Sequence, residues 1–392
     1  MWLSDFRIVL PDTVLPQGSL RIEEGRIAEV VDHPVANARI DGRGLLLMPG
    51  FIDMHGDMIE REVEPRPNVT MPMELGLRDL DRRLKVAGVT TGYAAVSFTP
   101  KSVHGHLRSY EHSSQMLRAL KQMRDILQVD HRVHARFEVN FPNALDVIDE
   151  LIAEGTVDLV SLMDHTPGQG QYRDLEKIRA NAMRAGATAE EAEENIQRRI
   201  EMRTAAQGDV GATLAAISAT CAEHGIALAS HDDDTAEKVA LMQSLGAGIS
   251  EFPVTLDAAR EARTRGLLTA MGAPNALRGE SYSGNLSARE AWEDGVLDIL
   301  AADYHPSAIL PAILVLARSA GRDLAAATRL ATLNPARALN LQDRGAIEPG
   351  RRADLVIADD EGVGHVRVTL SGGRPIYSDG TLTPRDLPLA AQ

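Results

Sequence analysis

Residues 50–57 have the sequence Gly-Phe-Ile-Asp-Met-His-Gly-Asp, an apolar run that ends in two side chains suited to binding metal. Side chains alternate between the two faces of a β-strand, so His55 and Asp57 are expected to point to the same side. Gly56 adds no side chain between them. We therefore interpret this stretch as a buried strand that ends in a pair of metal ligands.

On the C-terminal side of this stretch, apolar runs alternate with helical patterns. The candidate strands cover residues 50–56, 89–97, 133–141, 157–164, 226–231, 248–254, 267–272 and 297–303. Such alternation is typical of a parallel sheet in an α/β protein. Eight strand and helix units predict a (β/α)8 TIM barrel over residues 50–344.

The two ends of the chain differ from the middle and are similar to each other. Short strand-like runs occupy residues 6–10, 19–22, 26–31, 354–357, 365–370 and 374–377. Glu24 and Gly25 separate two of these runs, as a hairpin turn would. We expect residues 1–49 and 345–392 to form one small β-sandwich domain built from both termini.

Residues 171–208 are longer than a barrel connection requires, and they are highly charged and helical in pattern. A solvated helical hairpin is one interpretation of this insertion. A lid over the site is the other, because the insertion directly follows a candidate ligand strand. The sequence leaves both open.

The charge balance of the chain excludes some partners. The 392 residues include 41 Lys and Arg against 56 Asp and Glu, a net charge of −15, and only 4% aromatic residues. Such a chain has neither the positive field nor the stacking platforms of a nucleic-acid or anionic-membrane binder. Its single cysteine, Cys221, fits a reducing compartment. No signal peptide or membrane span is evident, so we expect a cytoplasmic protein.

Further histidines and carboxylates stand at the ends of other predicted strands. They are Glu138, His165, His231 and Asp303. A TIM barrel places its chemistry at the carboxyl ends of its strands. Any one of these residues has an ordinary hydrogen-bonded role as its alternative, but three histidines and three carboxylates at five strand ends favour a metal site. Imidazole and carboxylate ligands suit zinc, our first expectation, or manganese or iron, as one or two divalent ions.

Two segments resemble motifs of the amidohydrolase superfamily, whose members are metal-dependent barrels with a small β-sandwich formed by both ends. They are residues 46–55, Leu-Leu-Met-Pro-Gly-Phe-Ile-Asp-Met-His, and residues 350–356, Gly-Arg-Arg-Ala-Asp-Leu-Val. Five further segments are similar to one family within it, diphosphatases that act on α-D-ribose 1-methylphosphonate 5-triphosphate in the carbon–phosphorus lyase pathway. These segments are residues 64–69, 159–169, 229–233, 271–279 and 303–306. The resemblance covers nearly the whole chain and implies hydrolysis of that triphosphate to the 5-phosphate and diphosphate.

The chain departs from the superfamily pattern on its first strand. Most of the superfamily has His-x-His there, where this chain has His55 and Asp57. The diphosphatase family also has Asp, but more often with Thr than with Gly between the two. The resemblance implies that Glu138 replaces the usual carboxylated lysine. It also implies that His165 and His231 lie one strand later than the apolar runs place them, so we expect a strand missed before them.

The resemblance also implies roles for residues around the metal. Asp303 is expected to be both a metal ligand and the general base. Arg66 and Arg278 are candidates for binding phosphate, because guanidinium matches phosphate oxygens, with surface solubility as their alternative role. Arg136 either reaches the chamber or pairs with a carboxylate in the barrel. Weaker, neutral candidates for substrate binding are Gln169, Ser283 and Asn285.

Two other functions stay open. An amidohydrolase that cleaves a C–N bond would use the same metal site, but for a neutral substrate it would not need Arg66 and Arg278. A non-catalytic scaffold would have lost ligands, whereas all six positions carry competent side chains. We expect a small phosphorylated sugar as substrate, with no nucleic acid or membrane as partner, and leave open whether the chain forms a homodimer.

Overall fold

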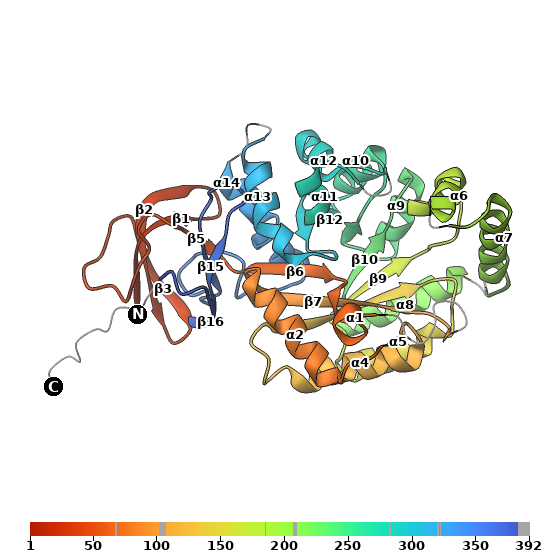
Figure 1. The fold of residues 1–392 in the computed structure, drawn as a ribbon, viewed down its shortest axis with the longest axis horizontal. Helices are drawn as coiled ribbons and strands as arrows, with labels where there is room; N and C mark the ends of the chain where they lie inside the picture. The colour runs from red at the N-terminus through yellow and green to blue at the C-terminus, as the bar shows by residue number, and fades with distance from the viewer. Residues whose placement is uncertain are drawn as a thin grey trace.

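The computed structural model describes residues 1–382 except 67–68, 102–106, 185, 207–209, 282–283, 320 and 322. Two sheets organise the chain (Figure 1). A small sheet built from both ends of the chain lies at one side, and a larger parallel sheet wrapped by helices lies at the other.

The larger sheet is a nearly closed barrel of eight parallel strands in chain order. They are β6 (Phe51–Gly56), β7 (Val89–Phe98), β8 (Asp130–Glu138), β9 (Leu159–Met163), β10 (Ala227–His231), β11 (Ile249–Glu251), β12 (Leu268–Gly272) and β13 (Ile299–Ala301). The barrel closes where the backbone N–H of Asp303 donates to His55 O and that of Asp57 donates to Asp303 O, both at 2.8 Å.

The predicted TIM barrel is therefore confirmed, and its eight strands lie where the apolar runs place them. The expectation of a missed strand is wrong, because His165 and His231 directly follow β9 and β10, the fourth and fifth strands. Among the described residues, three non-glycine residues within two positions of a barrel strand's end have positive φ: Asp232 at 51°, Phe252 at 54° and Asp303 at 55°. This conformation is tolerated by Asp but costly for Phe, and non-glycine residues that adopt it cluster at functional sites.

Helices cover the outside of the barrel (Figure 1). They are α1 (Met58–Val63), α2 (Met73–Val86), α4 (Tyr110–Met123), α5 (Ala144–Ala153), α8 (Val210–His224), α9 (Ala236–Ser244), α10 (Leu256–Thr264), α11 (Ala273–Arg278), α12 (Ala288–Asp294), α13 (Ile309–Ala317), α14 (Leu324–Arg329) and α15 (Leu333–Ala338). Leu77, Leu80 and Leu84 recur along one face of α2 and are buried, the spacing of an amphipathic helix. Among the described residues, no helix combines the length and the apolar character that crossing a membrane requires.

The small sheet combines strands from both termini in the order β16, β15, β14, β5, β1, β2, β3, with β4 beside β1. Their bounds are β1 (Trp2–Val9), β2 (Val14–Glu23), β3 (Arg26–Val31), β4 (Ile40–Asp41), β5 (Leu46–Pro49), β14 (Leu355–Ala358), β15 (Val366–Ser371) and β16 (Arg374–Ser378). Glu24 and Gly25 form the predicted hairpin turn, with φ of 50° and 76°. Antiparallel pairing of β5 with β14 joins the two ends. The domain limits at residues 49 and 345 stay predictions.

The charged insertion after β9 forms η1 (Gly170–Tyr172), α6 (Leu175–Arg184) and α7 (Ala189–Ala206). The helices α6 and α7 stand at the right edge of the view in Figure 1. A half-buried ion pair between Arg179 and Glu193 joins these two helices. Tyr172 of η1 packs its ring against His165, with 5.7 Å between ring centroids. The insertion thus contacts one candidate ligand, and its closure as a lid stays a prediction.

Candidate active site

A cavity of about 530 Å³ opens at the carboxyl ends of the barrel strands. Four of the six predicted ligands line it: His55, Asp57, His231 and Asp303. The other two, Glu138 and His165, form a hydrogen-bonded pair beside it, and the His165 ring lies 5.6 Å from the His231 ring. The structure therefore gathers all six residues at one end of the barrel, and their roles as ligands stay predictions.

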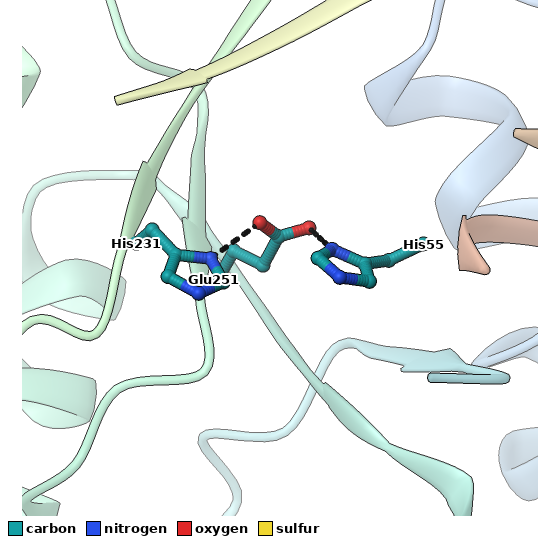
Figure 2. A group of neighbouring side chains, drawn as sticks. All are labelled: His55, His231 and Glu251. Carbon is teal, nitrogen blue, oxygen red and sulfur yellow. Dashed lines mark hydrogen bonds and ion pairs between the residues drawn. The ribbon is translucent and has the colours of Figure 1, made fainter. Parts of the chain in front are cut away.

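A buried glutamate that the sequence interpretation missed joins two of the histidines. Figure 2 shows the carboxylate of Glu251, the last residue of β11, between the imidazole rings of His55 and His231. One carboxylate oxygen lies 2.7 Å from His55 Nδ1 and the other lies 2.7 Å from His231 Nδ1. Burial alone would raise the pKa of Glu251, but the nearby imidazoles of His55 and His134 and the hydrogen bond from His231 lower it well below its usual range. The neighbouring imidazoles therefore favour the ionised form of Glu251.

A second group of donors surrounds Asp232, which the sequence interpretation also missed. Asp232 Oδ2 lies 3.5 Å from His165 Nε2 and 3.7 Å from His231 Nε2. These separations exceed an ordinary hydrogen bond. Within the described part of the chain, neither Asp232 Oδ2 nor His165 Nε2 has a hydrogen-bond partner, and both atoms are buried. Buried polar atoms are rarely left in this state, so the group suits a cation that would bind both.

The predicted ligand pair at the end of β6, His55 and Asp57, is fixed by neighbours on both sides. Asp57 Oδ1 lies 3.2 Å from His55 Nε2 and accepts a 2.8 Å hydrogen bond from Arg136. Arg136 also lines the cavity, so both expectations for it hold. Burial alone would raise the pKa of Asp57, but the charges of Arg136 and His55 lower it, so Asp57 is ionised. Burial alone would lower the pKa of His55, but the charges of Glu251 and Asp57 raise it to about 10. These carboxylates thus favour positive charge between them.

Asp303 differs from the other carboxylates of the cavity. Burial, and then the negative charge of Asp57, raise the pKa of Asp303 to about 6. A carboxylate with a pKa near the working pH can both accept and release a proton. Its place at the barrel closure fixes its backbone next to His55. This geometry is compatible with the predicted role of Asp303 as general base.

The donor set fits a divalent metal ion. Two groups bring one ligand atom from each member within 4.8 Å of one another: His55, His231 and Glu251, and His165, His231 and Asp232. Imidazole nitrogens and carboxylate oxygens are the ligands that zinc, manganese and iron accept. The unpartnered, buried atoms of His165 and Asp232 support this fit. The identity and number of the ions stay open.

The predicted substrate residues are divided by the structure. Arg278 and Asn285 line the cavity. Arg66 is exposed and is not among the described residues that line it. Gln169 likewise does not line it, since its side-chain amide binds Asp164. Ser283 lies outside the described residues.

The cavity also contains residues that sequence reasoning passed over. Arg61 of α1 and Gln171 of η1 line it. In the sequence, Arg61 has the pattern of an ordinary surface residue on a short helix. Its position could have identified it, because Arg61 lies four residues after Asp57 on the connection that follows the first ligand strand.

Comparison with known proteins identifies relatives of the whole chain. A family model described as "Amidohydrolase family" matches residues 46–376. The chain is 37% identical over 366 residues to the alpha-D-ribose 1-methylphosphonate 5-triphosphate diphosphatase of Escherichia coli (strain K12), covering 91% of this chain and 95% of that protein. An adenine deaminase of Methanoregula boonei is 54% identical over 50 residues, which are 13% of this chain and 9% of that protein.

Solved structures share the fold at low sequence identity. N-acetyl-D-glucosamine-6-phosphate deacetylase from Mycobacterium smegmatis superposes with a TM-score of 0.64 at 15% identity, covering 96% of this chain and all of that chain. Dihydropyrimidinase from Brevibacillus agri gives a TM-score of 0.57 at 12% identity, covering 98% and 96% of the two chains. Both the family match and the full-length relative cover most of the sequence. The chain therefore belongs to the amidohydrolase family and is a hydrolase.

Proposed function

We propose that this chain hydrolyses α-D-ribose 1-methylphosphonate 5-triphosphate to the 5-phosphate and diphosphate, with one or two divalent ions, of which zinc is the first candidate. The observation that carries the proposal is the 37% identity to the E. coli diphosphatase over 91% of this chain. The breaking bond is the P–O–P bridge between the phosphate on C5 and its neighbour. We place the reaction in phosphonate catabolism in the cytoplasm, and the homodimer stays a prediction.

The arginines of the cavity support a phosphorylated substrate. Arg61, Arg136 and Arg278 line the same cavity as His55 and Asp303. The whole chain carries a net charge of −15, so attraction for a triphosphate has to come from local cations. Guanidinium groups match phosphate oxygens with two parallel hydrogen bonds.

Two of these arginines are available to a ligand. Arg278 contacts the exposed Glu280 at 3.4 Å, with 42% of its own side chain exposed. Arg61 is exposed and has no hydrogen-bond or ion-pair partner among the described residues. A phosphate group would therefore gain their hydrogen bonds without breaking a buried pair. Arg136 is different, because it already binds Asp57 within the barrel.

The chain's own residues supply the positions for hydrolysis. The imidazoles of His55, His165 and His231, with Asp57 and Asp232, would hold the metal. When bound, a divalent ion lowers the pKa of water and polarises phosphoryl oxygens. Asp303 would accept the proton of the attacking water and pass it on, since its raised pKa of about 6 leaves it ionised near neutral pH. Arg61 and Arg278 would balance the negative charge that develops on the departing diphosphate.

Cleavage of a C–N bond is the second candidate. The short similarity to adenine deaminases favours it, but that similarity covers only 13% of this chain in the case of Methanoregula boonei. A neutral purine would have no need of the two cavity-lining cations Arg61 and Arg278. A non-catalytic scaffold is disfavoured, because the family and its full-length relative are hydrolases.

One assay separates the candidates. The purified protein is loaded in turn with zinc, manganese and iron and given either the ribose 5-triphosphate phosphonate or adenine. Released diphosphate and ammonia are measured in parallel. We expect diphosphate from the triphosphate and no ammonia from adenine. Ammonia from adenine, with no diphosphate from the triphosphate, would refute the proposal.

A further inference from the structure

Glu251 connects two strands of the site at a single carboxylate. His55 comes from β6 and His231 from β10, and each directs its Nδ1 at one oxygen of Glu251, at 2.7 Å in both cases (Figure 2). Glu251 has no exposed surface and does not line the cavity, whereas both histidines do. The glutamate therefore lies behind the two rings as seen from the cavity.

A carboxylate with one oxygen 2.7 Å from each of two imidazole Nδ1 atoms can accept a hydrogen bond from both rings. Both Nδ1 atoms therefore carry a hydrogen, so a metal ion that binds either ring does so through Nε2, in place of any proton there. His55 Nε2 faces Asp57 at 3.2 Å, and His231 Nε2 faces Asp232 at 3.7 Å. Both Nε2 atoms thus point at other members of the donor set.

The residue that follows Glu251 fixes the same two rings from another direction. The Phe252 ring packs edge to face on His55, with 4.9 Å between centroids, and on His231, with 5.5 Å. Phe252 has a φ of 54°, which is costly for a bulky side chain. The strained backbone at Phe252 thus lies where Glu251 and Phe252 both contact the imidazoles of His55 and His231.

We propose that Glu251 is a positioning residue that orients His55 and His231 together, so that both bind metal through Nε2, and that it is not itself a ligand. The proposal rests on the proposed metal-dependent function. A metal between Glu251 and the Nδ1 atoms would have to replace both hydrogen bonds. It would also lie away from the cavity, out of reach of a substrate.

Sharing one carboxylate makes the two histidines interdependent. In a Glu251→Gln variant, the amide offers one acceptor oxygen and one donor NH₂ group. It can satisfy one Nδ1–H, but its NH₂ opposes the other. That second ring would have to accept at Nδ1, so its proton would move to Nε2, where it blocks metal binding. One isosteric change is therefore expected to remove one ligand of the pair.

The test measures zinc binding to the full chain without substrate. Competition with a fluorescent chelator gives the affinity of the wild type and of Glu251→Gln, and circular dichroism checks the fold. Loss of a partner that orients a metal-bound histidine typically weakens binding 10–100-fold, and we expect about that loss. Equal zinc affinity in the two proteins would overturn the proposal.

A second measurement needs no variant. In ¹⁵N-histidine-labelled, zinc-loaded wild type, nuclear magnetic resonance should show protonated Nδ1 on both His55 and His231, assigned through His55→Asn and His231→Asn. Zinc binding that removes both Nδ1 protons would make Glu251 a ligand and overturn the positioning role. Zinc-loaded Glu251→Gln should retain one of the two Nδ1 protons.

Asp81→Asn is the matched control. Asp81 is also a buried carboxylate bound to a histidine, His131, at 3.1 Å, but that pair lies at the start of β8, outside the site. We expect this variant to bind zinc as the wild type does. Equal weakening in both variants would mean a general loosening of the barrel and would overturn the proposal. Substrate identity is tested separately, because wild type that binds zinc through this pair yet releases no diphosphate refutes only the proposed reaction.

Discussion

The two ends of the barrel each contain a buried arginine, and the two arginines are paired very differently. At the amino end, Arg344 donates to Asp130 at 2.6 Å, to Asp343 at 2.8 Å and to Thr91 Oγ1 at 2.9 Å. Only 6% of its side chain is exposed. Its charge is matched by two carboxylates, so Arg344 belongs to a closed electrostatic network.

At the carboxyl end, Arg136 has one carboxylate partner among the described residues, Asp57 at 2.8 Å, and a weak contact with the sulfur of Met163 at 3.3 Å. Around it, buried atoms such as Asp232 Oδ2 have no hydrogen-bond partner within the described chain. A satisfied network stabilises one structure, whereas unsatisfied charge is retained where something else is to bind. This contrast agrees with the rule that barrels place stability at the amino end and chemistry at the carboxyl end.

The strongest test of this contrast is Asp303→Asn, which removes the proposed base and leaves the shape of the site. We expect diphosphate release to fall about 10²–10⁴-fold, the usual contribution of a general base. Stability should not fall, because the raised pKa of Asp303 means that the fold disfavours its charged form. A discontinuous assay of released diphosphate measures the rate, and thermal melts measure the stability. Activity within threefold of the wild type would exclude Asp303 as the base.

Arg344→Met tests the opposite end. Removing Arg344 takes hydrogen bonds from Asp130, Asp343 and Thr91, while Arg132 still pairs with Asp130, and Asp343 is partly exposed. The loss of these bonds is expected to cost about 3 kcal/mol in the free energy of unfolding. The rate per folded molecule should stay unchanged, because Arg344 is not among the described residues that line the cavity. Urea unfolding gives the first quantity, and kcat of the refolded protein gives the second. A large loss of kcat with unchanged stability would contradict the assignment of stability to the amino end and of chemistry to the carboxyl end.

Much of the barrel and of the site at its carboxyl end could be predicted from the sequence, because buried strands leave apolar runs and a barrel places ligands at the ends of its strands. The eight runs match the eight strands, and His165 and His231 follow the fourth and fifth strands as those runs indicate. Shifting them by a strand on the basis of the resemblance was wrong. A count taken from this chain's own apolar pattern was the better guide to its strands.

The residues that were missed depend on contacts between distant parts of the chain. Glu251 ends a strand of three residues, and only the neighbouring positions of β6 and β10 make its carboxylate a partner of two histidines. Arg61 and Arg66 are equivalent as sequence, yet only Arg61 is among the cavity-lining residues. Direction of a helix or loop side chain is set by packing, which local pattern does not determine.

Arg278→Met separates ligand recognition from stability at the carboxyl end. A hydrogen bond to a charged group contributes about 1.5–3 kcal/mol, so kcat/KM for the triphosphate should fall about 10–100-fold. The free energy of unfolding should barely change, because 42% of the Arg278 side chain is exposed and its pair with Glu280 is long, at 3.4 Å. Steady-state kinetics and urea unfolding provide the measurements, with Arg66→Met as the control arginine. Equal losses of kcat/KM in Arg278→Met and Arg66→Met would mean that lining the cavity does not distinguish Arg278 from Arg66.

The smallest expected effect is the loss in acid of the stability that the Asp81–His131 pair contributes at the amino end of the barrel. Burial alone would raise the pKa of Asp81, but hydrogen bonds from His131 and from the backbone N–H of Val129 lower it to about 2. The unfolded value is about 3.9, so the ionised carboxylate contributes up to about 2 kcal/mol of stability at neutral pH. Because the folded pKa is the lower one, this contribution is present above the unfolded pKa and is lost as the pH falls from about 4 to 2.

Asp81→Asn cannot ionise, so the comparison with wild type isolates this contribution. Urea unfolding of both metal-free proteins at pH 7, 4 and 2.5 should show a stability difference that is largest at pH 7 and narrows as acid protonates Asp81. Residues of the carboxyl end are the same in both proteins, so their own titration cancels in the difference. A gap that stays constant down to pH 2.5 would mean that Asp81 stabilises by shape alone, and the amino end would then owe its stability to the Arg344 network rather than to Asp81.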